Sequence, residues 1–217
     1  MKITGRELRV ELDDSLKDRI RLHREAFIQN AKTGPLFSRY LSKETNSSLK
    51  DPDPANTENT KSVTLNDSYA LYHIVSKIRP RVIVEIGTFI GTSASIMAMA
   101  MRDLGIDGKI YTCDKNNIYG GGEHDGMIKY HNMKSEKFLK LLLKMGVRAD
   151  MFFVDASLSE GDEKIIRLIK NGRIVYANHD KMLPKGVRNM DRINRVIPNC
   201  EVSIPSGSEW IYIMEEK

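Results

Sequence analysis

The sequence has few of the residues that mark secreted or membrane proteins. Its 217 residues include two cysteines, Cys113 and Cys200, which are too few for a disulfide framework and lack the spacing of a metal site. No run approaches the ~18 apolar residues that a membrane span requires. Residues 1–7 lack the apolar core of a signal peptide. We therefore expect a cytoplasmic protein that binds no membrane.

An excess of charge of one sign is also missing. The net charge is +5, but the 34 basic residues are distributed among 29 acidic ones, and the charged clusters at 17–25 and 188–195 mix both signs. Such clusters are typical of solvated helix faces. Aromatic residues make up 7% of the chain and are not interleaved with the basic ones as in a base-stacking platform. We expect a small-molecule substrate and no nucleic acid partner.

The two common phosphate-binding fingerprints are absent, and a different glycine turn stands in their place. Residues 81–94 form a buried-strand run that ends in Gly87-x-x-x-Gly91 and opens a helix, which Thr92 or Ser93 can cap. Because the spacing matches neither fingerprint, a pyrophosphate is not the expected ligand. Glu85, at the strand end, would repel phosphate and attract a cationic amino group. The alternative is an ordinary strand-to-helix turn.

A second strand, expected at 109–114, ends in the carboxylate of Asp114. An acidic residue some 20 positions after a glycine turn is placed to accept hydrogen bonds from both ribose hydroxyls of an adenosine moiety. The alternative is a solvated aspartate that begins a loop, which residues 115–117 would suit. Because Asp114 ends an apolar run that follows a helix, we favour the ribose role.

These segments resemble the class I S-adenosylmethionine-dependent methyltransferases, and within them the catechol and caffeoyl-CoA O-methyltransferase group. The resemblance lies in residues 85–93, Asp114 and residues 150–156, and it extends from about residue 64 onward. It implies that Gly87 and Gly91 surround the methionine part of the cofactor, with Glu85 near its amino group, and that residues 132–135 lie beside the adenine. The expected cofactor-binding residues are Glu85, Gly87, Thr88, Gly91, Ser93, Asp114, Lys115, Met133, Ser135 and Asp155.

Helices and strands alternate from residue 64 onward, which predicts a doubly wound, Rossmann-like α/β sheet. We expect it to be mostly parallel with an antiparallel last strand. The expected strands are 81–87, 109–114, 127–131, 150–155, 173–178, 200–204 and 209–214, and the expected helices begin at 66 or 67, 92, 134 and 159. Residues 63–217 would form the S-adenosylmethionine-binding domain.

Residues 1–62 are expected to form an N-terminal helical extension that ends in a mobile loop. Leu16, Ile20, His23, Phe27 and Ile28 recur at helical spacing. Residues 43–60 are polar, contain proline and have almost no apolar anchors, which is typical of a loop or lid. The resemblance allows this extension to contribute to the substrate lid or to a homodimer contact.

The catalytic residues should lie at the carboxyl ends of the strands. Asp155 ends the fourth strand, and His179 and Asp180 follow Asn178 at the end of the fifth. In the metal-dependent O-methyltransferases, an Asp at the first place and an Asp-Asn pair at the second bind a divalent cation. The order here is Asn-His-Asp, so this chain departs from that pattern.

Three alternatives remain for this cluster. Asp155, Asp180 and Asn178 could bind Mg²⁺, with His179 shifting the preference toward manganese, iron or zinc. His179 could instead act as a general base toward a substrate hydroxyl. Finally, His179 and Asp180 could form a structural hydrogen bond at the strand end.

The function that the sequence predicts is S-adenosylmethionine-dependent methyl transfer to an oxygen of a small molecule, with possible help from Mg²⁺ or another divalent cation. The transfer would be an in-line displacement in which positioning is the main catalytic contribution. Two alternatives are an aminopropyltransferase-like enzyme, which shares the fold, and a non-catalytic adenosine-ligand binding protein.

Overall fold

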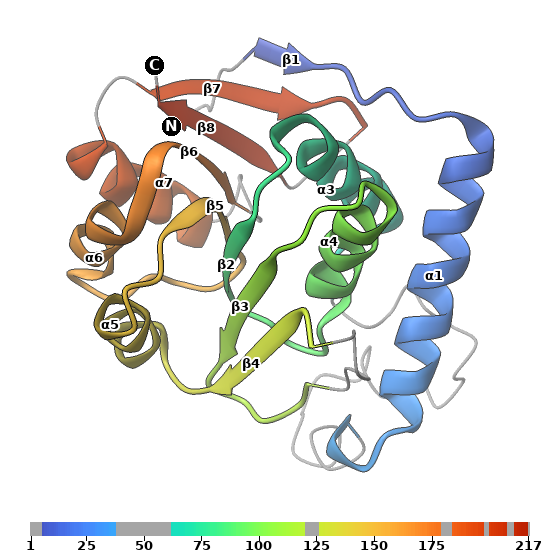
Figure 1. Ribbon diagram of the computed structural model, residues 1–217, viewed down its shortest axis with the longest axis horizontal. Coiled ribbons are helices and arrows are strands. Elements are labelled where there is room, and N and C mark those ends of the chain that lie inside the picture. Colours follow the sequence, from blue (N-terminus) through green and yellow to red (C-terminus); the bar gives the residue numbers. More distant parts are fainter. Residues whose placement is uncertain are drawn as a thin grey trace.

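The computed structural model describes residues 6–37, 62–119, 126–178, 184–197, 200–207 and 211–216. Their centre is an eight-stranded sheet with the strand order β1-β7-β8-β6-β5-β2-β3-β4 (Figure 1). The strands are β1 (Arg6–Leu8), β2 (Val82–Ile86), β3 (Lys109–Asp114), β4 (Ile128–Asn132), β5 (Ala149–Val154), β6 (Lys170–Asn178), β7 (Cys200–Pro205) and β8 (Tyr212–Glu216). No helix in these ranges is long and apolar enough to cross a membrane.

The five strands from β4 to β6 run parallel, and β8 is antiparallel to both of its neighbours, β6 and β7. The order reverses between β2 and β5, because the chain builds β3 and β4 on one side of β2 and places the later strands on the other. The carboxyl ends of neighbouring parallel strands lie at one edge of such a sheet, and a ligand crevice opens where the order reverses. The predicted doubly wound sheet with an antiparallel last strand is confirmed.

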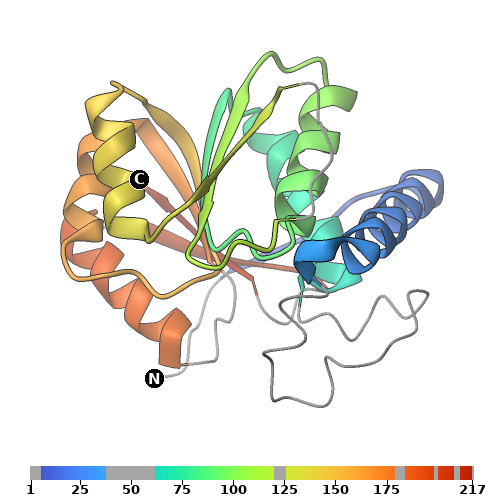
Figure 2. The same cartoon turned by 90° about the horizontal axis from the view of Figure 1, so that it is seen from below.

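Helices cover both faces of the sheet (Figures 1 and 2). Helices α3 (Leu65–Ile78) and α4 (Thr92–Asp103) cover one face, and α5 (Ser135–Lys144), α6 (Asp162–Ile169) and α7 (Pro184–Val196) cover the other. Successive residues of β2 therefore enter different cores: Ile83 packs with the first helix layer, and Val84 and Ile86 pack with the second. Burial on both faces explains why this strand reads as a continuous apolar run.

The N-terminal helix α1 (Asp14–Thr33) lies outside α4 and α3, as Figure 2 shows. His23 Nε2 lies 2.7 Å from Ser95 Oγ of α4. The Arg24 side chain is 2% exposed and donates to the carbonyl oxygen of Val63 from Nε at 3.1 Å and from Nη2 at 3.0 Å. Helix α1 lies in the segment expected to form the helical extension, while residues 38–61, which contain the expected loop at 43–60, lie outside the described residues.

Strand β1 was not predicted from the sequence. It pairs in parallel with β7, with Arg6 opposite Ser203 and Leu8 opposite Pro205. Three residues with one apolar side chain among them form no recognisable strand pattern. This strand can therefore be recognised only from its pairing with β7. The extension is thus connected to the sheet as well as to its helices.

Candidate functional site

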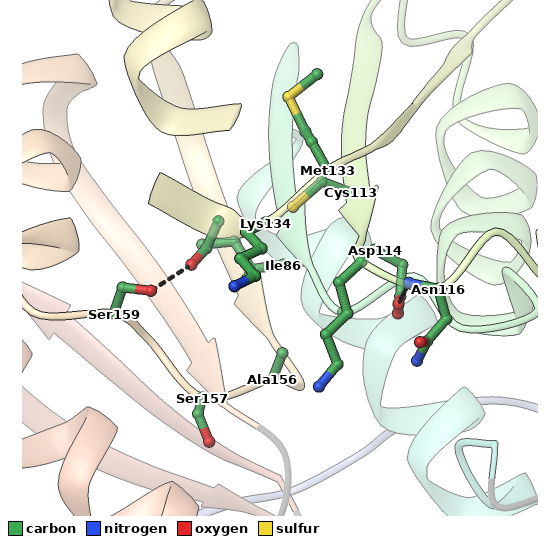
Figure 3. Close-up of a pocket in the computed structure, with 12 residues that line it drawn as sticks. Ile86, Cys113, Asp114, Asn116, Met133, Lys134, Ala156, Ser157 and Ser159 are labelled. Carbon is green, nitrogen blue, oxygen red and sulfur yellow. Dashed lines mark hydrogen bonds between the residues drawn. The ribbon is translucent and has the colours of Figure 1, made fainter. Parts of the chain in front are cut away.

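A pocket of about 370 Å³ opens at the carboxyl ends of β2, β3 and β5 (Figure 3). In Figure 3, Asp114 and Asn116 lie on one side of it, Ser159 lies on the opposite side, and Cys113 and Met133 lie above. It is lined by Ile86, Gly87, Cys113, Asp114, Lys115, Asn116, Met133, Lys134, Ser135, Ala156, Ser157 and Ser159. The pocket lies where the strand order predicts a ligand crevice.

The glycine turn after β2 leaves no room for a side chain. Gly87 and Gly91 have φ angles of 102° and 101°, which favour glycine. A Cβ atom on Gly87 would lie 2.8 Å from the carbonyl carbon of Asp155, and one on Gly91 would lie 2.5 Å from Cε2 of Tyr119. The Gly87 N–H donates to the Cys113 carbonyl oxygen at 2.9 Å, which connects the turn to β3.

Asp114 is fixed by backbone donors from two loops. Its Oδ2 accepts the Phe89 N–H at 2.9 Å, and its Oδ1 accepts the Asn116 N–H at 2.7 Å. Phe89 has a φ of 49°, which is unusual for a residue with a side chain. The backbone of the turn is therefore strained at the residue whose N–H donates to Asp114. Each carboxylate oxygen can accept a further hydrogen bond. Asp114 can therefore still receive hydroxyl donors from a ligand in the pocket.

Glu85 lies fully buried beside the turn and does not line the pocket. Its Oε1 accepts the Ser93 hydroxyl at 2.5 Å, and its Oε2 accepts the Thr112 hydroxyl. Thr88 Oγ1 lies 2.5 Å from Thr112 Oγ1 and extends this network. Burial raises the pKa of Glu85 to about 7, and the nearby Asp155 carboxylate adds to this effect. The network connects β2, β3, the turn and α4.

The prediction that Thr92 or Ser93 caps α4 was wrong. Its N-cap is Gly91, which makes no side-chain capping hydrogen bond. Ser93 points to Glu85 instead, and the buried Thr92 hydroxyl has no hydrogen-bond partner among the described residues. The demand of the buried carboxylate for donors therefore outweighs the capping preference of a hydroxyl residue.

The opposite end of the pocket is built from side chains at the starts of α5 and α6. Asp162 is fully buried, and its Oδ2 accepts the Ser135 hydroxyl at 2.6 Å and the Ser159 N–H at 2.7 Å. Burial raises the pKa of Asp162. Helix α6 begins at Asp162, later than the predicted residue 159, because Ser159 forms this turn and Gly161 enters it with a φ of 91°.

Asn189 of α7 holds the loop between β5 and α6. It is 1% exposed, accepts the Leu158 N–H at 3.1 Å and donates to the Ala156 carbonyl oxygen at 2.9 Å. The sequence did not point to Asn189 or Asp162 as site residues, since their partners are distant in the chain or depend on the exact helix start. An acidic residue three positions after Ser159 at a helix start was the one local signal available for Asp162.

The structure brings half of the predicted cofactor residues to the pocket wall. These are Gly87, Asp114, Lys115, Met133 and Ser135, whereas Glu85, Thr88, Gly91, Ser93 and Asp155 do not line it. The Asp155 N–H donates to the Ile86 carbonyl oxygen at 2.8 Å, so this residue follows β5 directly beside the turn.

The predicted catalytic and metal residues are only partly described. His179 and Asp180 lie outside the described residues, while the backbone of Asn178 pairs with Val154 at the end of β6. Within the described ranges, no group of three or more His, Cys, Asp or Glu side chains could hold a metal ion. The metal site and the catalytic roles of Asp155, His179 and Asp180 remain predictions.

Comparison with known proteins agrees with this geometry. Residues 84–171 match the family model of a methyltransferase domain. No curated protein matches the chain in sequence.

Three similar solved structures have the same fold. The O-methyltransferase TomG from Streptomyces achromogenes, in complex with S-adenosylmethionine, is 17% identical with a TM-score of 0.58 over 82% of this chain and 94% of its own. An O-methyltransferase from Bacillus cereus, in complex with S-adenosylhomocysteine, is 16% identical with a TM-score of 0.56 over 85% and 98%. The S-adenosylhomocysteine-bound methyltransferase PaMTH1 from Podospora anserina is 17% identical with a TM-score of 0.55 over 99% and 100%.

The strand order and the match over residues 84–171 show a methyltransferase-like fold, and the glycine turn followed by Asp114 lies within the matched region. The resemblance to the catechol and caffeoyl-CoA O-methyltransferase group agrees with the O-methyltransferases among these similar structures.

Proposed function

We propose that this protein transfers the methyl group of S-adenosylmethionine to an oxygen atom of a small molecule. The observation that carries the proposal is Asp114, whose carboxylate is held by the Phe89 and Asn116 N–H groups at the wall of a pocket that the glycine turn also borders. The pocket volume of about 370 Å³ lies in the range of small-molecule sites. Two of the similar structures are O-methyltransferases, which favours oxygen as the acceptor atom.

The proposed ligand orientation follows from the chemistry of the two pocket ends. Asp114 accepts the ribose hydroxyls, Gly87 borders the methionine part, and the segment from Met133 to Ser135 borders the base. Gly87 allows close approach because it carries no Cβ. Lys115 follows Asp114 at the pocket rim, where its charge is available to an anionic group.

When bound, S-adenosylmethionine supplies a methyl group that its sulfonium has already activated. The protein then has to align the acceptor oxygen, exclude water and accommodate the hydroxyl proton. Asp155 directly follows β5, and its backbone lies against the turn at Gly87, which supports a position for it at the proposed methionine end. We assign it, with His179 and Asp180, to proton removal or to binding a divalent cation that would favour the deprotonated hydroxyl.

Calorimetric titration with S-adenosylmethionine, S-adenosylhomocysteine and NAD tests the cofactor assignment. We expect micromolar binding of both adenosyl ligands, lost in Asp114→Ala because the ribose hydroxyls lose their acceptor. Asp107→Ala removes an exposed carboxylate outside the pocket and should bind as the wild type does. Binding of NAD alone, or of no ligand, would contradict the proposal.

Turnover assays test the chemistry separately from the binding. Candidate small-molecule hydroxyl acceptors are offered with S-adenosylmethionine, with Mg²⁺ or with a chelator, to the wild type and to Asp155→Ala, His179→Ala and Asp180→Ala. We expect these variants to bind the cofactor but to lose turnover. Loss of activity in the presence of the chelator would indicate that these three residues bind a cation. Unchanged turnover in all three variants would contradict their catalytic role.

A further inference from the structure

The N-terminal helix α1 contacts the glycine turn from outside the pocket. Ile28, Ala31 and Phe37, at the C-terminal end of α1 and just beyond it, form a separate buried cluster with Ile90, and Phe89 packs against it. We call this group the turn cluster. In Figure 1 the C-terminal end of α1 lies at the end of the molecule toward which β3 points. Helix α1 therefore reaches the residues that follow β2.

The turn cluster lies next to the strained residue of the turn. Phe89 has a φ of 49°, and its N–H donates to Asp114 Oδ2 at 2.9 Å. A left-handed conformation at a residue with a side chain persists only where the surrounding structure imposes it. Ile90 and Ile28 are both fully buried in the turn cluster, so Ile90 cannot move without opening a close-packed contact. This packing holds the neighbouring Phe89 in place.

Helix α1 also contacts the end of the turn and the helix that follows it. A Cβ atom on Gly91 would lie 3.3 Å from Cζ of Phe27, so the backbone of Gly91 lies close to α1. One helical turn earlier, His23 Nε2 lies 2.7 Å from Oγ of Ser95, in the first turn of α4. Because α1 follows the chain from the turn into α4, a displacement of α1 would displace the turn as well.

We propose that the C-terminal half of α1 positions the turn for the cofactor, with Ile28 acting through Ile90 to hold the Phe89 N–H against Asp114. Docking of α1 and binding of the adenosyl ligand are then coupled, and each favours the other by the same factor. Ile28 is a positioning residue, since no residue of α1 lines the pocket. This inference rests on the proposed function, because it takes the ligand of Asp114 to be S-adenosylmethionine or its product.

Helix α1 offers a matched pair of variants for the test. Ile20 and Ile28 are both fully buried, but Ile20 packs in the core of α3 and α4 and not in the turn cluster. Ile28→Ala should weaken S-adenosylhomocysteine binding about tenfold or more in calorimetry, because the turn then populates its binding conformation less. Ile20→Ala removes the same atoms and should lower the unfolding temperature similarly, yet bind within about threefold of the wild type.

A milder pair of variants covers the case in which an alanine variant does not fold. Ile28→Val and Ile20→Val each remove one methyl group, and only Ile28→Val should weaken binding, by about two- to fivefold. Equal affinities in the two valine variants, or an equal loss of affinity in the two alanine variants, would overturn the positioning role of Ile28.

Hydrogen exchange of the wild type measures the same coupling from the side of the ligand. Saturating S-adenosylhomocysteine should slow amide exchange in residues 24–33 by about tenfold or more relative to residues 14–20 of the same helix. Because no residue of α1 lines the pocket, direct contact with a ligand bound there would not produce this difference. Equal changes in both halves of α1 would overturn the coupling.

The outcomes are distinguishable from those of the proposed function. A wild type that binds S-adenosylhomocysteine as tightly as Ile28→Ala does would overturn the positioning role and leave the adenosyl pocket intact. A wild type that does not bind this ligand would overturn the proposed function and this inference together.

Discussion

The two ends of the pocket are built in different ways. At the glycine turn, the backbone itself forms the wall, and Gly87 and Gly91 leave no space for a Cβ atom. At the other end, side chains form the wall, and Ser135 and Ser159 take their positions from Asp162. A backbone wall defines shape and tolerates no added atom, whereas a side-chain wall defines hydrogen-bond polarity and can be altered one group at a time.

Each end contains one buried carboxylate, and the two are bonded differently. Glu85 receives hydroxyl donors on both oxygens. Asp162 receives a hydroxyl and a backbone N–H on Oδ2, while its buried Oδ1 has no hydrogen-bond partner among the described residues. The comparison predicts that substitutions near Glu85 change stability and turn geometry, while those near Asp162 change the pocket wall formed by Ser135 and Ser159.

The largest effect is expected for Gly87→Ala. The added Cβ would lie 2.8 Å from the Asp155 carbonyl carbon and 3.0 Å from the Ala156 nitrogen, which are backbone atoms with little freedom to move. We expect S-adenosylmethionine to bind about 100-fold more weakly or worse, measured by calorimetry together with thermal unfolding. Gly146→Ala introduces a similar strain at a φ of 70° with no atom within 4 Å and should leave binding unchanged. Wild-type binding by Gly87→Ala would show that the backbone wall is not rigid.

A smaller effect is expected for Gly91→Ala, because the atom that its Cβ meets belongs to a side chain. Tyr119 Cε2 would lie at 2.5 Å, and the Tyr119 ring stacks on Tyr130 with centroids 4.7 Å apart. We expect about tenfold weaker cofactor binding. The double variant Gly91→Ala/Tyr119→Leu should recover part of this loss, measured against Tyr119→Leu alone. Absence of any recovery would assign the whole effect to the strained φ.

Glu85→Gln should alter the pH dependence of stability. Burial raises the pKa of Glu85 to about 7 from 4.5, so the folded protein holds this proton over a range in which the unfolded chain has released it. The free energy of unfolding should therefore fall by about 3 kcal/mol as the pH rises from about 4.5 to about 7, and then level off. The glutamine variant should lose this contribution. Urea unfolding at pH 5, 6, 7 and 8 measures it, and parallel profiles for both proteins would contradict the prediction.

Ser93→Ala should have a smaller effect on stability than Glu85→Gln. It removes the hydroxyl that donates to Glu85 Oε1 and should cost about 1–2 kcal/mol of stability at pH 8. At pH 5 the cost should be smaller, because Glu85 is then protonated. Urea unfolding at both pH values measures the difference, and an equal cost at pH 5 and pH 8 would contradict the prediction.

The parts of the site that the sequence predicted depend on local pattern. The apolar run of β2, the glycine spacing and the strand from Lys109 to Asp114 are each contained in a short segment, and β3 has the predicted bounds. The position of Asp114 could also be predicted from the bounds of this strand, because the carboxyl ends of parallel strands lie at one edge of the sheet.

The parts that the sequence did not predict depend on partners far apart in the chain. Ser93 looks like a helix cap until Glu85 is seen to be buried beside it. Asp162 and Asn189 acquire their roles from Ser135 and from the carbonyl group of Ala156, which are 27 and 33 positions away. Short-range periodicity contains no information on such pairs.

The pairing of β1 with β7 affects the order in which the chain can be completed. Val10 donates to Ser206 Oγ across 196 positions, and the Ser206 N–H donates to the Leu8 carbonyl oxygen at 2.7 Å. During synthesis on the ribosome, β1 emerges early but has no strand to join until β7 has followed. Until the two strands pair, each would present unpaired backbone groups, the kind of edge at which chains associate. Of the described strands, the earliest in the sequence is therefore among the last that the sheet can accept.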